Sequence, residues 1–236
     1  MIYDIRHVTA YSYASEVSYA HCALRLTPRE EPGQRVEWSE LQLAPRAARL
    51  EPQTCFFGNR VVMATITAPH RALRIEARAR VAVSRPPPPA PAATPAWDAL
   101  REAAFAIASL AAESPAHMLH PSRLAPLHRP ATDYARASFP PGRPALEAAL
   151  DLTRRIRADF IYDPEATQVT TPLGETSAAR RGVCEVFAHI MISCLRGIGI
   201  PAGYVSGYLR TDPPQGKPRL DRKSTRLNSS HVSESR

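Results

Sequence analysis

Residues 182 to 201 constrain the fold of this chain more than any other stretch. A glycine turn at Gly182 precedes Cys184, and the apolar residues that follow recur at the spacing of one helical face over about four turns. This face consists of Val183, Phe187, Ile190, Met191, Cys194, Leu195 and Ile198. Two glycines and a proline then end the pattern by residue 201. The stretch predicts a largely buried helix with Cys184 in its first turn.

The predicted position of Cys184 suits a nucleophile. Unpaired backbone N–H groups at a helix start carry partial positive charge, which favours a thiolate. The alternative is a small core residue, which is our interpretation of Cys194 ten residues later. A helix start lowers a thiol pKa but supplies no base, so the position alone does not decide between them.

Five short segments carry a family resemblance. They are Phe160–Pro164, Thr171–Leu173, Arg181–Cys184, Phe187–His189 and Tyr204–Leu209. They resemble the bacterial transglutaminase-like family, a branch of the papain-like cysteine enzymes, and the resemblance runs through nearly all of residues 1 to 220. The family usually has glutamine and aspartate after the cysteine, whereas this chain has Glu185 and Val186.

The resemblance implies an α+β fold and a reaction. The fold would be an N-terminal antiparallel β domain, followed by a papain-like, transglutaminase-like core whose cysteine helix packs on an antiparallel sheet. Cys184 would attack a carboxamide or peptide carbonyl of a protein or peptide substrate. An amine or water would then resolve the thioester, and no cofactor is implied. A histidine and an aspartate on two later strands would complete the triad.

The last sixteen residues differ in character from the rest of the chain. Residues 221–236 are polar and aperiodic, and residues 221–231 match one translated frame of a common sequencing adapter. We expect native sequence to end near Leu220. His231, Asp212 and Asp221 are then not triad residues, and the chain lacks both the histidine and the aspartate. The full-length parent would be an enzyme and this truncated chain inactive. The alternative is a non-catalytic, protein-binding scaffold with a degenerate cysteine domain.

The remaining sequence suggests the domain order. Residues 1–85 are rich in β-branched and aromatic residues, and residues 73–83 alternate apolar and charged side chains, which predicts strands. Residues 86–95 form a proline-alanine linker. Residues 96–220 would form the truncated core. Within it we expect a helix capped by Thr94-Pro95 and running to about Glu113, another from Pro144 to Phe160, and a strand from Ala202 to Arg210.

Charge and composition argue against other functions. The net charge of +8 comes mainly from scattered arginines, which favours a generally basic surface over nucleic-acid binding. We expect no membrane span and no secretory signal, hence a cytoplasmic location. The four cysteines lack zinc or disulfide spacing, and His117, His120 and His128 match no ligand pattern. His189 lies five residues after Cys184, about 140° around the helix, so it is neither a co-ligand nor the base.

Overall fold

The computed structural model describes residues 1–163 and 171–208. The described chain divides into two units, Met1–Pro86 together with residues 206–208, and Pro87–Val205. The predictions for the tail 221–236, for Asp212, Asp221 and His231, and for the two last residues of the predicted strand Ala202–Arg210 lie outside the described residues.

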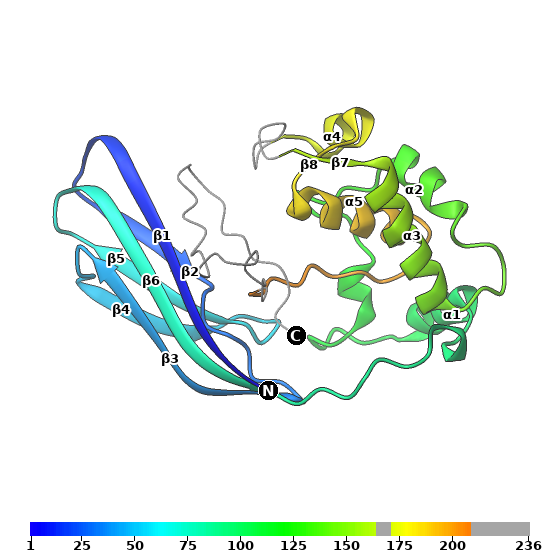
Figure 1. Ribbon diagram of the computed structural model, residues 1–236, viewed down its shortest axis with the longest axis horizontal. Helices are drawn as coiled ribbons and strands as arrows, with labels where there is room; N and C mark the ends of the chain where they lie inside the picture. The colour runs from blue at the N-terminus through cyan, green and yellow to red at the C-terminus, as the bar shows by residue number, and fades with distance from the viewer. Residues whose placement is uncertain (164–170, 209–236) are drawn as a thin grey trace, which may run out of the picture. The chain divides into compact units, whose positions relative to one another are not determined.

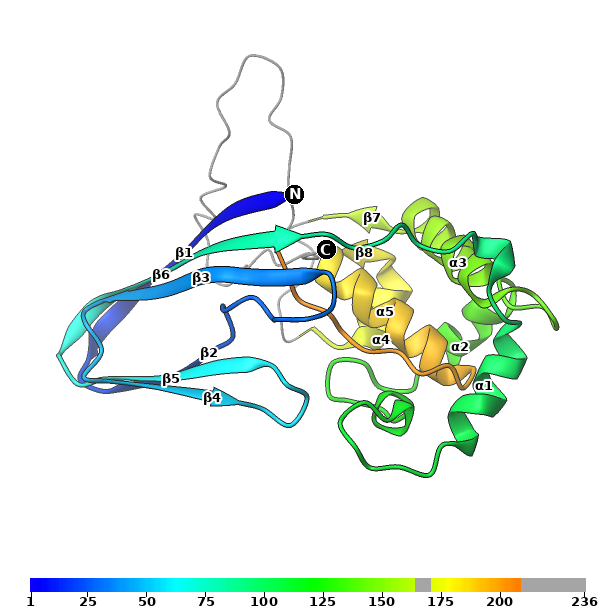
Figure 2. The same ribbon diagram turned by 90° about the horizontal axis from the view of Figure 1, so that it is seen from below.

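The first unit contains two three-stranded antiparallel sheets (Figures 1 and 2). The first sheet has the order β1 (Ile2–Val17), β6 (His70–Val83) and β3 (Gln34–Ala44). The second has the order β2 (Ala20–Leu24), β5 (Arg60–Ile66) and β4 (Arg49–Thr54). Leu73 and Ile75 of β6 pack with Leu24 and Ile66 of the second sheet. The two sheets therefore share one apolar core.

Strand β6 shows the predicted alternation with one exception. The odd-numbered side chains from Leu73 to Val81 are buried, and the arginines between them are exposed. Glu76 is only 2% exposed because three arginines cover it. Its carboxylate pairs with Arg6 at 2.8 Å, Arg74 at 2.6 Å and Arg78 at 2.7 Å. Hydrogen bonds from these guanidinium groups hold the pKa of Glu76 at about 2.

Strand β4 has no alternating pattern in the sequence. Its Pro52 lacks a backbone N–H and cannot donate to a neighbouring strand. The strand lies at an edge of its sheet and pairs only with β5. An edge strand tolerates proline, which explains why composition did not mark this segment as a strand.

The second unit is mainly helical. Its helices are α1 (Trp97–Ala106), α2 (Arg129–Arg136), α3 (Ala145–Asp159), α4 (Leu173–Ala179) and α5 (Cys184–Gly197), with short 3₁₀ turns at Pro91–Ala93 and Pro115–Met118. A two-residue parallel pair joins β7 (Ile161–Tyr162) to β8 (Arg181–Gly182). The proline-alanine linker thus contains one 3₁₀ turn, Pro91–Ala93.

Helix α1 and its predicted cap are corrected by the structure. The helix ends at Ala106 instead of near Glu113. Beyond it Ile107 is 48% and Leu110 81% exposed, so the apolar residues expected to extend the helix have little packing to stabilise them. The Thr94 hydroxyl does not cap α1. It accepts a hydrogen bond of 3.1 Å from the N–H of Leu146 and thereby caps α3.

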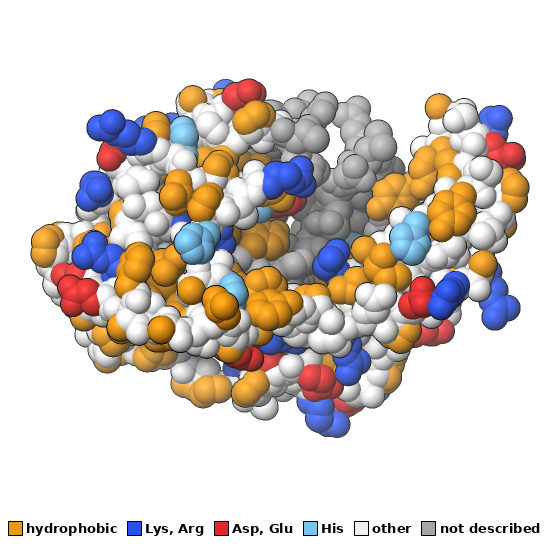
Figure 3. Space-filling view, turned by 180° about the vertical axis from the view of Figure 1, so that it is seen from behind, with side chains coloured by type: hydrophobic (Ala, Val, Ile, Leu, Met, Phe, Trp, Pro, Cys, Tyr) orange, Lys and Arg blue, Asp and Glu red, His pale blue; other side chains and the backbone are white. Residues whose placement is uncertain are grey.

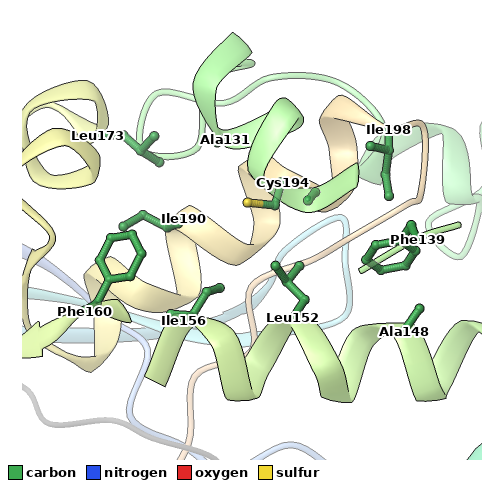
Figure 4. Close-up of a cluster of buried hydrophobic side chains, with 11 residues drawn as sticks. Ala131, Phe139, Ala148, Leu152, Ile156, Phe160, Leu173, Ile190, Cys194 and Ile198 are labelled. Carbon is green, nitrogen blue, oxygen red and sulfur yellow. The ribbon is translucent and has the colours of Figure 1, made fainter. Parts of the chain in front are cut away.

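The core of the second unit lies between α2, α3, α4 and α5. Leu152 and Ile156 of α3 face Ile190 and Cys194 of α5 (Figure 4). Gly197 lies against Thr132 of α2 so closely that a Cβ atom would overlap the threonine side chain. Within the described residues α5 therefore packs on helices, which fix its orientation.

The predicted strand from Ala202 is not formed in the described residues. Residues 201–208 have no strand assignment. The N–H of Ala202 donates to the carbonyl of Met118 at 3.0 Å. Further on, the Tyr208 hydroxyl donates to the carbonyl of Leu26 at 2.7 Å. An extended segment becomes a strand only when a neighbouring strand pairs with it.

Candidate functional site

Cys184 is the first residue of α5, as the periodicity predicted, and it is exposed. Val183 precedes it in an extended conformation and makes no side-chain capping bond. The carbonyl of Val183 accepts the N–H of Phe187 at 3.1 Å and so begins the helix. Val183 therefore leaves the backbone N–H groups of the first turn without a cap from its side chain, and these groups present partial positive charge near the thiol.

The segment before Cys184 is held by the pair of β7 and β8. The N–H of Ile161 donates to the carbonyl of Arg180 at 2.8 Å, and the N–H of Asp163 donates to the carbonyl of Gly182 at 2.9 Å. The side chains of Arg181 and Asp163 add an ion pair of 3.6 Å. These contacts fix the backbone up to two residues before the thiol.

Gly182 has a different role from the predicted turn. It lies in β8, and its φ is not among the positive values of the chain. A Cβ atom at this position would lie 3.0 Å from Cγ1 and 3.1 Å from Cβ of Val186. A side chain at this position would therefore crowd Val186 in the first turn of α5, and the glycine avoids this contact.

Three titratable side chains, Glu185, His189 and Tyr204, lie near the start of α5. The rings of His189 and Tyr204 are 5.1 Å apart, and Glu185 lies one helical turn before His189. Burial lowers the pKa of His189, and the Glu185 carboxylate partly opposes this. Burial raises the pKa of Tyr204, and the charges of Glu185 and Cys184 raise it further. Tyr204 thus lies within electrostatic range of the thiol.

Sequence reasoning did not select Tyr204 as a site residue. It comes twenty positions after Cys184, in a segment without the periodicity that marks α5. The sequence excludes His189 as a metal co-ligand of Cys184 and as its base, and in the structure its ring contacts Tyr204. No hydrogen bond between His189 and another residue accompanies this contact in the described part of the chain.

The four cysteines are free and differ in environment. Cys194 is fully buried, which raises its pKa to about 12. Burial also raises the pKa of Cys22. Cys55 is half-buried, and hydrogen bonds from Asn59, chiefly from its backbone, lower the pKa of this thiol. Cys184 is the exposed thiol among the four.

Two other features concern metals and surfaces. Among residues 1–163 and 171–208, no three His, Cys, Asp or Glu side chains gather as metal ligands, and no helix is both long and apolar enough to cross a bilayer. Lys and Arg side chains are scattered over the face seen in Figure 3. This distribution differs from the concentrated basic stripe typical of nucleic-acid binding.

Known proteins resemble both parts of the chain. Residues 3–82 match the family described as the bacterial transglutaminase-like N-terminal region, and residues 133–233 match the transglutaminase-like superfamily. Uncharacterized proteins of Mycobacterium bovis and Mycobacterium tuberculosis are each 39% identical over 221 residues, covering 92% of this chain and 69% of the relative. An uncharacterized protein of Mycobacterium leprae is 28% identical over 203 residues, with 86% and 69% covered.

A solved structure supports the same fold. The crystal structure of a proposed cysteine protease from Cytophaga hutchinsonii superposes with a TM-score of 0.64 at 17% identity, covering 85% of this chain and 67% of that one. This likeness and the superfamily match confirm the predicted α+β class, an N-terminal β domain followed by a papain-like, transglutaminase-like core. The chain belongs to the transglutaminase-like superfamily and carries the bacterial transglutaminase-like N-terminal region.

Proposed function

We propose that this protein is a cysteine enzyme that transfers or hydrolyses acyl groups through Cys184. The thiolate attacks the carbonyl carbon of a carboxamide or peptide bond and forms a tetrahedral oxyanion. The C–N bond then breaks, the nitrogen leaves with a proton as ammonia or an amine, and a thioester remains. A primary amine or water attacks the thioester and regenerates the thiol. The substrate is a protein or peptide, and the setting is the reducing cytoplasm, where the thiol stays free.

One observation carries the proposal: an exposed thiol on the first residue of an apolar helix whose N-cap residue, Val183, makes no side-chain cap. The partial positive charge of the first turn attracts an anionic group at the start of the helix, such as the sulfur that attacks. The backbone N–H of Cys184 can also donate to the oxyanion as it forms. The same helix start thus supports both the nucleophile and the transition state.

The proton acceptor is a separate question from the nucleophile. His189 lies about 140° around α5 from Cys184, so the two side chains point in different directions. Its ring contacts Tyr204 instead. We propose that the base and its orienting carboxylate come from a part of the protein outside the described residues. Turnover and nucleophilicity therefore need separate measurements.

The experiment compares Cys184→Ala with the parent sequence in the protein expressed from its source gene. Incorporation of dansylcadaverine into casein measures transamidation, and release of ammonia from lysine-dimethylated casein without an added amine measures hydrolysis of the carboxamide. We expect Cys184→Ala to lower both rates at least about 10³-fold, since no other group replaces a covalent nucleophile. Cys55→Ser is the matched control, because it removes another accessible thiol, and it should leave the rates unchanged. Equal activity of Cys184→Ala and the parent would remove Cys184 from the mechanism.

A further inference from the structure

A pocket of about 340 Å³ lies on the second unit, away from the thiol. Its lining comes from α2, α4, the end of α3 and one residue of α5. Neither Cys184 nor Tyr204 belongs to the lining. A cavity of about 150 Å³ is enough to hold benzene, so this pocket can hold a ring together with a short side chain.

The floor of the pocket is apolar and rigid. Phe160 is 8% and Ile190 1% exposed, and both belong to the core cluster shown in Figure 4. The Tyr134 ring forms another wall. The tyrosine hydroxyl donates to Asp159 at 2.7 Å, and the guanidinium of Arg155 lies 4.2 Å from the ring centre. Because these bonds fix the ring, it offers the pocket an aromatic surface and no free donor.

The polar side of the pocket carries cationic and hydrogen-bonding groups. Arg180 is the charged residue of the lining, and His128 and Ser177 complete the polar side. The Nδ1 atom of His128 is buried and has no hydrogen-bond partner within the described residues. The Nε2 atom of the same ring lies on the α4 side of the pocket, 3.5 Å from where a Cβ atom at Gly174 would be.

Arg180 is held in place by its backbone. Its φ of 49° and ψ of 38° are left-handed, and its carbonyl accepts the N–H of Ile161 at 2.8 Å. The backbone at the end of α4 is therefore constrained, and Arg180 joins the lining of the pocket from this turn. Guanidinium groups bind planar carboxylates through paired hydrogen bonds.

We propose that this pocket binds a small aromatic carboxylic acid. The ring lies against Tyr134 and Phe160, and the carboxylate meets Arg180. The site is independent of the acyl-transfer chemistry proposed for Cys184. The acid leaves the active-site thiol free, so binding and turnover can be measured separately.

The test uses 3-phenylpropionate and its neutral analogue 3-phenylpropanamide, titrated into the full chain by calorimetry. We expect the acid to bind with a dissociation constant on the order of 1 mM or lower, as is typical of a ligand with about ten heavy atoms. Arg180→Asn removes the charge and keeps a residue that accepts the left-handed backbone. This variant should weaken binding of the acid at least about tenfold and leave binding of the amide unchanged.

A second pair of variants tests the place of binding. Ser177→Leu fills the pocket and should abolish binding of both compounds. Ala179→Leu adds the same side chain to an exposed position of α4 outside the lining, and it should bind both normally. The proposal is overturned if the acid does not bind, if Arg180→Asn binds it as tightly as the parent, or if Ala179→Leu weakens binding as much as Ser177→Leu. Arg180→Asn changes an exposed side chain, so it remains informative even if Ser177→Leu fails to fold.

Discussion

Alkylation rates of individual cysteines test the environment of Cys184 most directly. At about pH 7.5 a thiol with an ordinary pKa near 8.5 is about one-tenth thiolate. Cys194, whose pKa is about 12, is thiolate in about one molecule in 30,000. Its thiolate is intrinsically more nucleophilic, by a factor of about 40 at a Brønsted slope of ~0.45. The pKa alone therefore slows Cys194 about 80-fold relative to an ordinary exposed thiol.

Burial adds to this difference, because Cys194 is fully shielded from the reagent. We expect Cys184 to react with iodoacetamide at least about 100-fold faster than Cys194, as measured by mass spectrometry of peptides from the native chain. Cys55 is a competing thiol, since its pKa is lowered, and a Cys55→Ser background removes it. Unfolding in urea should bring the rates together. Rates for Cys184 and Cys194 within tenfold of each other in the native chain would refute the reasoning.

Three further predictions concern the fold. Thr94→Val removes the acceptor of the Leu146 N–H and should lower the free energy of unfolding of the second unit by about 1 kcal/mol in urea titrations, whereas Thr94→Ser should not. Gly182→Ala should cost about 1–3 kcal/mol in the same assay because its Cβ would lie 3.0 Å from Val186, and a neutral result would contradict the close contact. Glu76 has a folded pKa of about 2 against an ordinary 4.5, so its stabilising effect is present above about pH 4.5 and is lost as pH falls toward 2. Glu76→Gln should flatten this part of the pH dependence of the urea midpoint, and an unchanged profile would exclude Glu76 as its cause.

The elements that sequence predicted best are those whose stability depends on one continuous apolar face. The seven-residue pattern around Cys184 located α5 and placed the cysteine at its start. The alternation in residues 73–83 located β6 and its buried face. In both elements the side chains that face the packing partner recur at the period of a helix or a strand. The pattern can therefore be recognised within the sequence of the element alone.

The misplaced ends of elements have a different cause. The apolar spacing beyond Ala106 continues to fit a helix, yet Leu110 is 81% exposed and the chain leaves the helix. Thr94 has the right residue type for a cap, but it caps α3, about fifty positions later in the chain. Propensity identifies a capping residue, whereas tertiary packing decides which helix it serves.

The candidate site also combines residues that local sequence identifies with residues that only tertiary structure brings together. Cys184 could be selected because helix position and residue type are local properties. Tyr204 could not, since only the folded chain brings residue 204 against His189. Glu76 shows the same effect in the first unit: a charged residue at an even position is expected in solvent, but arginines at positions 6, 74 and 78 cover it. Because the partners of a polar side chain often come from distant positions, the nucleophile was predictable from local sequence and its surroundings were not.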